Sequence, residues 1–386
     1  AAQDIVNGQG FLFCDFHGDS MPQLLARIAA EELRRGNDLS PNLIVIEPAD
    51  PEFAVGINVL DRHPGQDIHV QLAEFAQLLK TRWHLDSFGA RTEELLRESL
   101  YVLAHSGLTI VELVPLLTNA AFRAECLART QNLEIVSYFR DRFDVQSEAM
   151  QGAMRDPILN KVSAFIVDEK FRHILGQRQS TFSLIQAIDD GCFIILHLDK
   201  GRLGDQVAVF AGLFLTRLKN ALFARRNRRL FTLYCDEVQN LVAYDTGLET
   251  LLSEARKFGV SVVTANQFSS QYPEQTRAAL AAVGTHIYFQ LSGQDADKVA
   301  ASLDGGRRLA ETLKNLPRRN VIVKSGHERY RHAVVPNVAD SKTPWTDLYN
   351  RSRQRWAKRR SEVEADIRQR QPRGRQTTER VLNDWE

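Results

Sequence analysis

The sequence has no apolar run long enough to cross a lipid bilayer. Its longest, Val207–Leu215, is far shorter than the roughly 18 to 20 residues that a membrane-spanning helix needs. The opening stretch, AAQDIVNGQG, has no Met at its start and no basic segment followed by an apolar one. We therefore expect neither a signal peptide nor the natural start of the protein here.

Cysteine is scarce, and the charges nearly cancel. The sequence has four cysteines, widely spaced and without a CxxC pair: Cys14, Cys126, Cys192 and Cys235. This spacing argues against a zinc ribbon or a disulfide framework, and we expect reduced, buried thiols in a cytoplasmic protein. Because the formal net charge is only +1, any binding to nucleic acid has to be local.

The composition that remains is that of an ordinary globular protein. The chain has 386 residues, of which 44% are hydrophobic and 25% charged. This length favours one large domain with an insertion, or two domains. Residues 11–46 alternate between strand-like apolar runs and a helix-like segment, which indicates a parallel sheet covered by helices.

The pattern then changes twice. From about residue 68 to residue 177 it is helical only, and Thr109 and Glu112 have the spacing of a capping box. Strand-like runs return from residue 193 onward, so the sequence predicts an α/β fold with an inserted all-helical subdomain. The predicted divisions are residues 1–67 and 181–340 for the sheet domain, 68–180 for the helical insertion and 341–386 for a basic C-terminal tail.

The C-terminal region has a distinct charge. Residues 351–386 contain 11 Lys or Arg against 6 Asp or Glu, a local net charge of +5, together with Trp356 and Trp385. Two interpretations stay open: a solvated helix that frays into a tail, and a segment that contacts nucleic acid or a partner protein.

The sharpest local signal is an apolar run, Leu230–Cys235, that ends in the adjacent carboxylates Asp236 and Glu237. After a strand, one carboxylate can hold Mg²⁺ through water molecules while the next polarises an attacking water. The pattern is typical of the Walker B strand of ATPases, with Asp236 on the metal and Glu237 as the catalytic base. An unrelated Asp-Glu turn in an ordinary α/β protein is the alternative.

An amide follows the next predicted strand. Residues 260–264 lead into Ala265, Asn266 and Gln267. Because neighbouring parallel strands end at one edge of the sheet, Gln267 is expected near the two carboxylates. There it could contact the γ-phosphate and the attacking water and so sense the bound nucleotide. A purely structural role at the strand end is the alternative.

Three further sets of polar residues have weaker assignments. Arg256 lies in a helix-like turn before Gly259, where a cation stabilises the helix dipole or, alternatively, reaches a neighbouring subunit's nucleotide. Asp15 and His17 follow the first strand, and we expect His17 to form loop hydrogen bonds rather than to be a catalyst. A basic turn at residues 225–229 is either solvated or a contact to DNA or a subunit.

The order of these motifs resembles the HerA/FtsK group of P-loop motors, and most closely the conjugative coupling proteins of the TraD/TraG type in type IV secretion. The resemblance extends over about residues 11 to 335, interrupted by the helical insertion. It is carried by the segments CDFHGD (14–19), IEPAD (46–50), GIN (56–58), LHLDKGRLG (196–204), LYCDEVQN (233–240), SEARKFGVSVVTANQ (253–267) and VGTHIYFQLSGQDADKVA (283–300).

The resemblance implies a RecA-like P-loop NTPase sheet, ATP and Mg²⁺ as ligands, and a hexameric ring that moves DNA through its pore without sequence preference. It makes Arg256 the arginine finger that acts on a neighbouring subunit's nucleotide. Relaxase or secretion-channel proteins are the further partners that it implies. The implied location is the cytoplasm, with attachment to the inner membrane through N-terminal segments.

The phosphate-binding loop of such ATPases is missing from the sequence. It contains no GxxxxGK[ST] segment and no Gly-Lys dipeptide. In the family this loop precedes the strand that holds Asp15, so we expect it upstream of Ala1, the complete protein to be an ATPase and these residues alone to be inactive. The alternatives are a non-hydrolysing ring subunit or scaffold, a soluble HerA-type motor that processes DNA ends, and a motor that moves protein.

Overall fold

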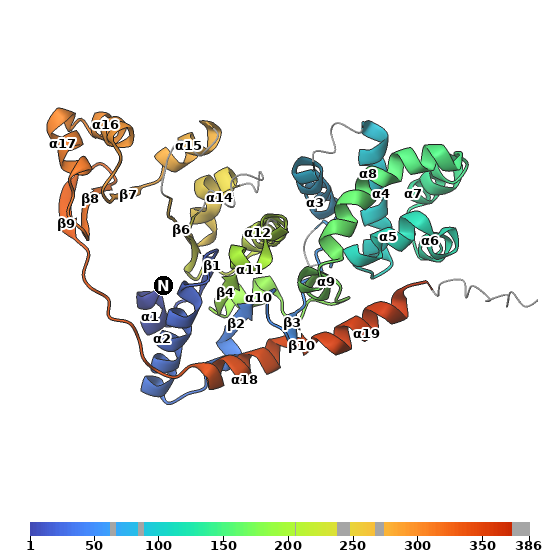
Figure 1. Cartoon of the computed structure of the whole chain (residues 1–386), viewed down its shortest axis with the longest axis horizontal. Helices are drawn as coiled ribbons and strands as arrows, with labels where there is room; N and C mark the ends of the chain where they lie inside the picture. The colour runs from blue at the N-terminus through green and yellow to red at the C-terminus, as the bar shows by residue number, and fades with distance from the viewer. Residues whose placement is uncertain (62–66, 84–88, 205, 238–247, 267–273, 373–386) are drawn as a thin grey trace, which may run out of the picture. The chain divides into compact units, whose positions relative to one another are not determined.

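The computed structural model of the chain (Figure 1) describes residues 1–61, 67–83, 89–204, 206–237, 248–266 and 274–372. The chain divides into two compact units. Unit 1 comprises Ala1–Glu47 and Ser183–Arg355, and unit 2 comprises Pro48–Phe182 and Trp356–Glu386. Each unit is thus assembled from two segments that are distant in the sequence.

Unit 1 is built on a five-stranded parallel sheet. Its strands are β1 (Phe11–Asp15), β2 (Leu43–Ile46), β4 (Phe193–His197), β5 (Phe231–Cys235) and β6 (Val260–Thr264). Their spatial order is β2-β4-β1-β5-β6, which places β1 at the centre. The first four strands are almost fully buried, as expected of parallel strands covered on both faces. The predicted α/β fold with a parallel sheet is confirmed.

Unit 1 also contains helices. They include α1 (Ala2–Asn7), α2 (Ser20–Arg35), α10 (Leu184–Asp189), α11 (Lys200–Leu203), α12 (Gln206–Ala224), α14 (Leu248–Glu254), α15 (Glu274–Ala281) and α18 (Thr346–Trp356), with the 3₁₀ turns η1 (Ser40–Asn42) and η5 (Ala255–Phe258). One buried cluster joins α1, α2 and α18 to the strands through Ile5, Leu25, Ile28, Phe11 and Leu348. These three helices therefore share one face of the sheet.

The helix α12 is both long and apolar. By length and hydropathy it is the one candidate membrane span among the described residues, but 78% of its apolar window is buried in the protein. Burial on nearly all sides is typical of a core helix packed within an α/β unit.

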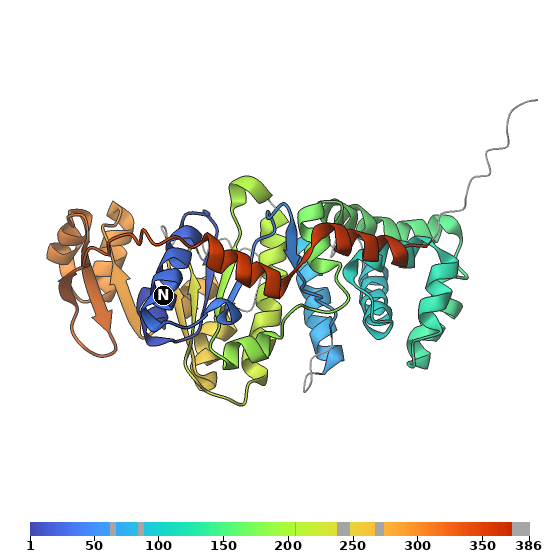
Figure 2. The same ribbon diagram turned by 90° about the horizontal axis from the view of Figure 1, so that it is seen from below.

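A small antiparallel sheet follows the large one in the chain (Figure 2). It has the order β7-β8-β9, with β7 (Thr285–Tyr288), β8 (Asn320–Ser325) and β9 (Arg331–Val334). Helices α16 (Gly293–Ser302) and α17 (Gly306–Lys314) connect β7 to β8. Ala300, Leu309, Leu313 and Ile322 form a separate core between these helices and the sheet.

Unit 2 is helical apart from the two-stranded ladder of β3 (Phe53–Val55) and β10 (Ala357–Arg359). Its helices are α3 (Ile68–Trp83), α4 (Ala90–His105), α5 (Leu113–Thr118), α6 (Ala120–Leu127), α7 (Leu133–Ser137), α8 (Glu148–Ile166), α9 (Glu169–Leu175) and α19 (Arg360–Arg370), with the 3₁₀ turn η3 (Ile110–Glu112) and the π-helix η4 (Tyr138–Phe143). The predicted helical insertion and the capping box of Thr109 and Glu112 are both present.

The C-terminal segment is packed along most of its described length. Leu348 and Ser352 of α18 are buried in unit 1, where the Ser352 hydroxyl donates to the Leu43 carbonyl at 2.7 Å. In unit 2, Val363 and Ile367 of α19 pack against Val111. Apolar residues spaced four apart give α19 one buried stripe, which a solvated helix would not need.

The basic turn before β5 contains one fully buried arginine. The Arg225 side chain is 0% exposed, and its guanidinium pairs with Asp189 at 2.8 Å. It also donates to the carbonyls of Arg229 at 2.9 Å and Phe258 at 3.4 Å. Arg226, next to it, is exposed. Arg225 therefore joins three chain segments and is neither solvated nor free to contact DNA.

We expect Arg225→Ala to lower the free energy of unfolding of the chain by about 2 to 4 kcal/mol, because it leaves the Asp189 carboxylate and two carbonyls without their partner. Urea denaturation followed by circular dichroism measures the change. The matched control, Arg226→Ala, should shift the free energy by no more than about 0.5 kcal/mol. Equal effects of the two substitutions would contradict a structural role for Arg225.

Candidate functional site

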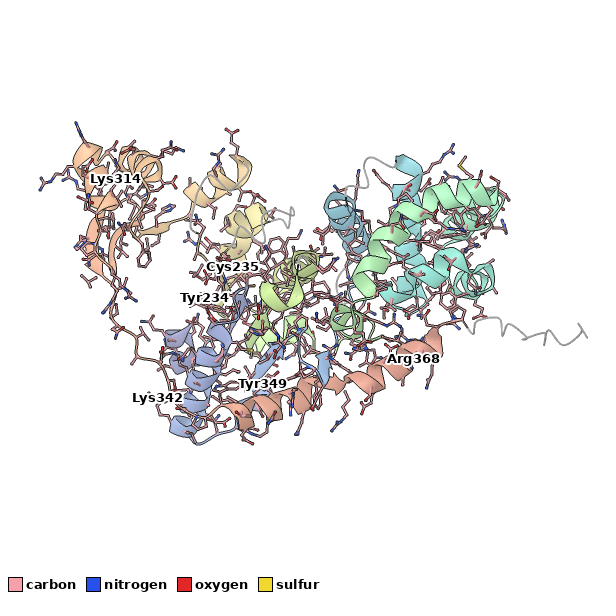
Figure 3. All side chains as sticks on the ribbon, in the orientation of Figure 1. Tyr234, Cys235, Lys314, Lys342, Tyr349 and Arg368 are labelled. Carbon is pink, nitrogen blue, oxygen red and sulfur yellow. The ribbon has the colours of Figure 1, made fainter. Side chains whose placement is uncertain are left out.

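Polar side chains gather where the central strands of unit 1 end. Asp15 ends β1, His197 ends β4, and Asp236 follows the last residue of β5 (Figure 3, where Cys235 is labelled). The register pairs Asp15 with His197 and Cys14 with Cys235, so all three polar residues lie at the same edge. In parallel α/β sheets this is the edge at which ligands bind.

The Asp15 carboxylate is buried and organises the turn that follows β1. It accepts hydrogen bonds from the backbone N–H groups of Gly18 at 2.9 Å, Ser20 at 3.1 Å and Met21 at 3.0 Å. Burial raises the pKa of Asp15, but the nearby His197 ring and these N–H groups outweigh burial and hold that pKa below its ordinary value. Asp15 is therefore a carboxylate anion that fixes the start of α2.

The imidazole of His197 lies beside this carboxylate. Its Nδ1 is 3.4 Å from Asp15 Oδ2, which is longer than a well-formed hydrogen bond. Apart from this contact, Nδ1 has no hydrogen-bond partner in the part of the chain that the structure describes. Gly18 approaches the ring closely, since a Cβ there would lie 3.3 Å from His197 and from Asp199. The φ of Gly18, +87°, also favours glycine.

The turn after β1 presents His17 to the turn after β5. His17 Nε2 lies 2.6 Å from Glu237 Oε1. This hydrogen bond raises the pKa of the His17 imidazole above its ordinary value. The predicted catalytic base is therefore held by a side chain from the neighbouring strand, as expected of a loop hydrogen bond but with a partner that the sequence did not indicate.

The two adjacent carboxylates of the predicted Walker B turn have different surroundings. Glu237 has a φ of +49°, a left-handed conformation that is uncommon for residues other than glycine. Its backbone N–H donates to Asp236 Oδ1 at 3.0 Å. Its carboxylate is directed to His17, whereas Asp236 keeps Oδ2 without a protein partner among the described residues. Backbone strain of this kind is concentrated at functional sites.

The residues fit a magnesium ion that is held mainly by water and phosphate. No group of three or more His, Cys, Asp or Glu side chains that could hold a metal ion occurs among the described residues. Mg²⁺ often uses only one or two carboxylates together with water and substrate phosphates. Asp236, whose Oδ1 accepts a hydrogen bond from the Glu237 backbone N–H, can supply such a ligand through Oδ2.

The structure separates Arg256 from the carboxylates. Arg256 is exposed in η5, just before β6, and the first residue of β6, Val260, pairs with Phe231 at the start of β5. The length of β5, about 16 Å at 3.3 Å per residue, thus lies between Arg256 and the edge that carries Glu237. Gln267 lies outside the described residues. The roles assigned to Arg256 and Gln267 stay predictions.

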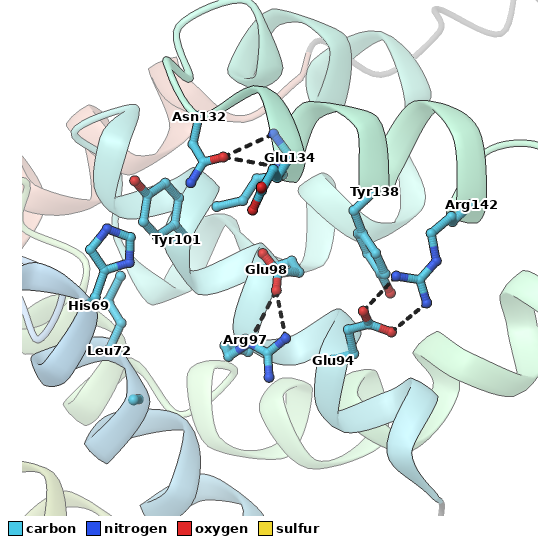
Figure 4. A pocket seen from close by; sticks show the side chains of 12 residues that line it. His69, Leu72, Glu94, Arg97, Glu98, Tyr101, Asn132, Glu134, Tyr138 and Arg142 are labelled. Atoms are coloured by element: carbon cyan, nitrogen blue, oxygen red, sulfur yellow. Dashed lines mark hydrogen bonds and ion pairs between the residues drawn. The ribbon is translucent and has the colours of Figure 1, made fainter.

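A polar cavity of about 440 Å³ lies in unit 2 between α3, α4, α7 and η4 (Figure 4). Four of its charged groups are already paired: Arg142 makes two hydrogen bonds to Glu94, at 2.7 and 2.8 Å, and Arg97 contacts Glu98 at 2.8 Å. Since these charges compensate one another, we assign no ligand to this cavity.

Comparisons with known proteins give solved structures alone. No family model and no curated protein matches the sequence. Structures of the bacterial conjugative coupling protein TrwB match it over 88% of both chains: the unbound form at 16% identity and a TM-score of 0.55, and the complex with ADP and Mg²⁺ at 15% identity and a TM-score of 0.56. The complex of TrwB with a non-hydrolysable ATP analogue matches at 16% identity and a TM-score of 0.56.

The chain has the fold of TrwB. The coverage of 88% includes parts of both units, so the likeness extends beyond the sheet itself. The predicted resemblance to coupling proteins is thereby confirmed at the level of the fold.

We expect the imidazole of His17 to titrate above the ordinary histidine value of about 6.5 and to return toward it in Glu237→Gln. Because folding raises the pKa of His17, the ion pair between His17 and Glu237 contributes fully to stability below about pH 6.5. This contribution is lost as the pH rises through the pKa of His17 in the folded protein. NMR titration of the His Cε1 signals, assigned with His17→Gln, measures this.

The control for this titration is Glu254→Gln, which removes an exposed carboxylate that pairs with Lys257 at 3.8 Å. It should leave the His17 signal unchanged. An unaltered His17 titration in Glu237→Gln would show that the two side chains do not interact in solution.

Proposed function

We propose that this protein is an ATP-driven DNA translocase of the conjugative coupling or type IV secretion type. One observation carries the proposal: in a chain with the TrwB fold, Asp236 and Glu237 follow the strand next to the central one, at the edge where ligands bind. TrwB has been solved with ADP and Mg²⁺ and with a non-hydrolysable ATP analogue, which supports a nucleotide as the ligand of this edge.

In the proposed reaction the two carboxylates divide the work. Asp236 holds Mg²⁺ through water, and the ion neutralises charge on the phosphates when it is bound. Glu237 accepts the proton of the water that attacks the γ-phosphate. In the described conformation the Glu237 carboxylate is occupied by a hydrogen bond from His17. The proposed catalysis therefore requires that this contact opens or lengthens.

The remaining features of the proposal come from the resemblance to coupling proteins. They are a hexameric ring, DNA bound without sequence preference, relaxase or secretion-channel partners, and a location at the cytoplasmic side of the inner membrane. The near-zero net charge agrees with local rather than global contacts to DNA.

A second candidate function is a non-hydrolysing ring subunit. The observation in its favour is that the sequence has no GxxxxGK[ST] segment, whose amides and lysine usually bind the β- and γ-phosphates. The combination of Asp236, Glu237, Arg256 and Gln267 favours the ATPase, because a subunit that only assembles has no need of these side chains.

Substitution of the two carboxylates should separate binding from chemistry. In a polypeptide with a GxxxxGK[ST] loop joined ahead of Ala1, Glu237→Gln should keep MgATP affinity but lower turnover by about 10² to 10⁴, the usual effect of losing a general base. Asp236→Asn should instead weaken magnesium-dependent binding. Calorimetric titration and phosphate release measure the two effects.

The 386 residues without such a loop are the control, and should bind ATP weakly and not hydrolyse it. Normal turnover by Glu237→Gln would show that the carboxylate roles are wrong. Rapid hydrolysis by the polypeptide without the loop would show that another element holds the phosphates.

Arg256 lies just before β6, beside the start of β5 and away from the carboxylates, which supports action on a neighbouring subunit's nucleotide rather than on its own. With the loop supplied, Arg256→Ala should assemble and bind nucleotide but lose about 10³ to 10⁵ in rate. Mixing it with inactive Glu237→Gln should restore part of the hydrolysis, because mixed rings can place an intact Arg256 beside an intact Glu237. Failure to recover despite demonstrated co-assembly would leave Arg256 as a helix-terminal cation.

A further inference from the structure

The hairpin formed by β8 and β9 concentrates positive charge. Residues 318–332 contain five cations and one carboxylate, Glu328, for a net charge of +4. The whole chain carries only +1, so the remaining residues together carry −3. The cations are Arg318, Arg319, Lys324, Arg329 and Arg331. This basic hairpin is therefore an electrostatic exception within the protein.

The cations of the basic hairpin have no carboxylate partner among the described residues. Arg319 donates to the Val335 carbonyl at 2.9 and 3.0 Å, and Lys324 donates to the Glu328 carbonyl. By contrast, Arg225 pairs with Asp189 at 2.8 Å in the same unit. The positive charge of the hairpin is thus available to an external anion.

An exposed aromatic ring stands among these cations. Tyr330 is 37% exposed and lies directly between Arg329 and Arg331, both of which are exposed. A turn that serves only to reverse the chain favours Gly, Asn, Asp or Ser and needs no aromatic side chain. Arginine and tyrosine together offer donors for phosphate groups and a flat surface for a base.

The basic hairpin is also supported from behind. Ile322 of β8 lies in the small core with Leu309 and Leu313 of α17, and Tyr288 of β7 packs against that core. β9 is an edge strand, paired with β8 alone in the described sheet. The exposed turn between the strands is therefore presented by an element that has its own hydrophobic support.

We propose that the basic hairpin binds a single-stranded nucleic acid, with Arg329 and Arg331 on phosphate groups and Tyr330 stacked on a base. Contacts to phosphate groups and stacking on a ring do not read the edges of the bases, so the binding is independent of sequence. Stacking requires an unpaired base, which selects single strands over a duplex. An acidic protein segment would satisfy the arginines but would make no use of the ring.

The proposal rests on the DNA translocase proposed above and deepens it, because it assigns DNA binding to named residues outside the carboxylate site. Binding to the hairpin needs neither ATP nor Mg²⁺ and is measured without either. A failure here leaves the carboxylate site untouched, and a failure of the ATPase experiments leaves the hairpin untouched.

The experiment is fluorescence anisotropy of the full chain with a labelled oligo(dT) of about 30 nucleotides, over a series of salt concentrations. Arg329→Gln/Arg331→Gln should reduce the slope of log K against log salt by about 1.4, or 0.7 for each lost phosphate contact. Tyr330→Ala should weaken binding about 5- to 100-fold, and Tyr330→Phe should bind like the parent.

The matched control is Arg226→Gln/Arg228→Gln, which removes two exposed cations from the turn before β5 and should keep the parental slope. The proposal is overturned if the parent does not bind oligo(dT), if the hairpin variant keeps the parental slope, or if both double variants weaken binding equally. Tighter binding to a duplex of the same length than to oligo(dT) would contradict stacking of Tyr330 on a base. Binding of poly-L-glutamate as tight as that of oligo(dT) at the same charge would contradict it too.

Discussion

The buried carboxylate of Asp15 ends the central strand of the sheet and begins the helix that follows it. The backbone N–H groups of Gly18, in the turn before α2, and of Ser20 and Met21, in the first turn of α2, donate to it. His197 from the neighbouring strand lies 3.4 Å away. Because a buried anion requires such partners, the turn after β1 has little freedom. That turn fixes the place of His17, so the arrangement of the candidate site depends on this one anion.

The contact between His17 and Glu237 joins the turns that follow β1 and β5. The left-handed backbone of Glu237 directs its carboxylate to the imidazole, while its N–H group is used by Asp236. A base held in this way is available for chemistry only after the hydrogen bond is released. The proposed catalysis would therefore have to break the contact between His17 and Glu237.

Several local features could be predicted because they depend on nearby residues. The alternation of apolar runs and helices gave the parallel sheet, and the spacing of Thr109 and Glu112 gave a capping box. The Asp236–Glu237 pair was found because it directly follows a buried strand. Arg225 could not be separated from its neighbour Arg226 by sequence, since burial against Asp189 depends on residues 36 positions away.

The sequence by itself determined the strands of the large sheet, the helical character of the insertion and the chemistry available at the strand ends, because periodicity and strand-end residues are local properties. Tertiary structure decided the strand order that makes β1 a neighbour of β5, and hence the contact of His17 with Glu237. It also decided that α18 packs in unit 1 and α19 in unit 2. These outcomes depend on packing between segments that are distant in the sequence, and a local sequence pattern does not specify which segments pack together.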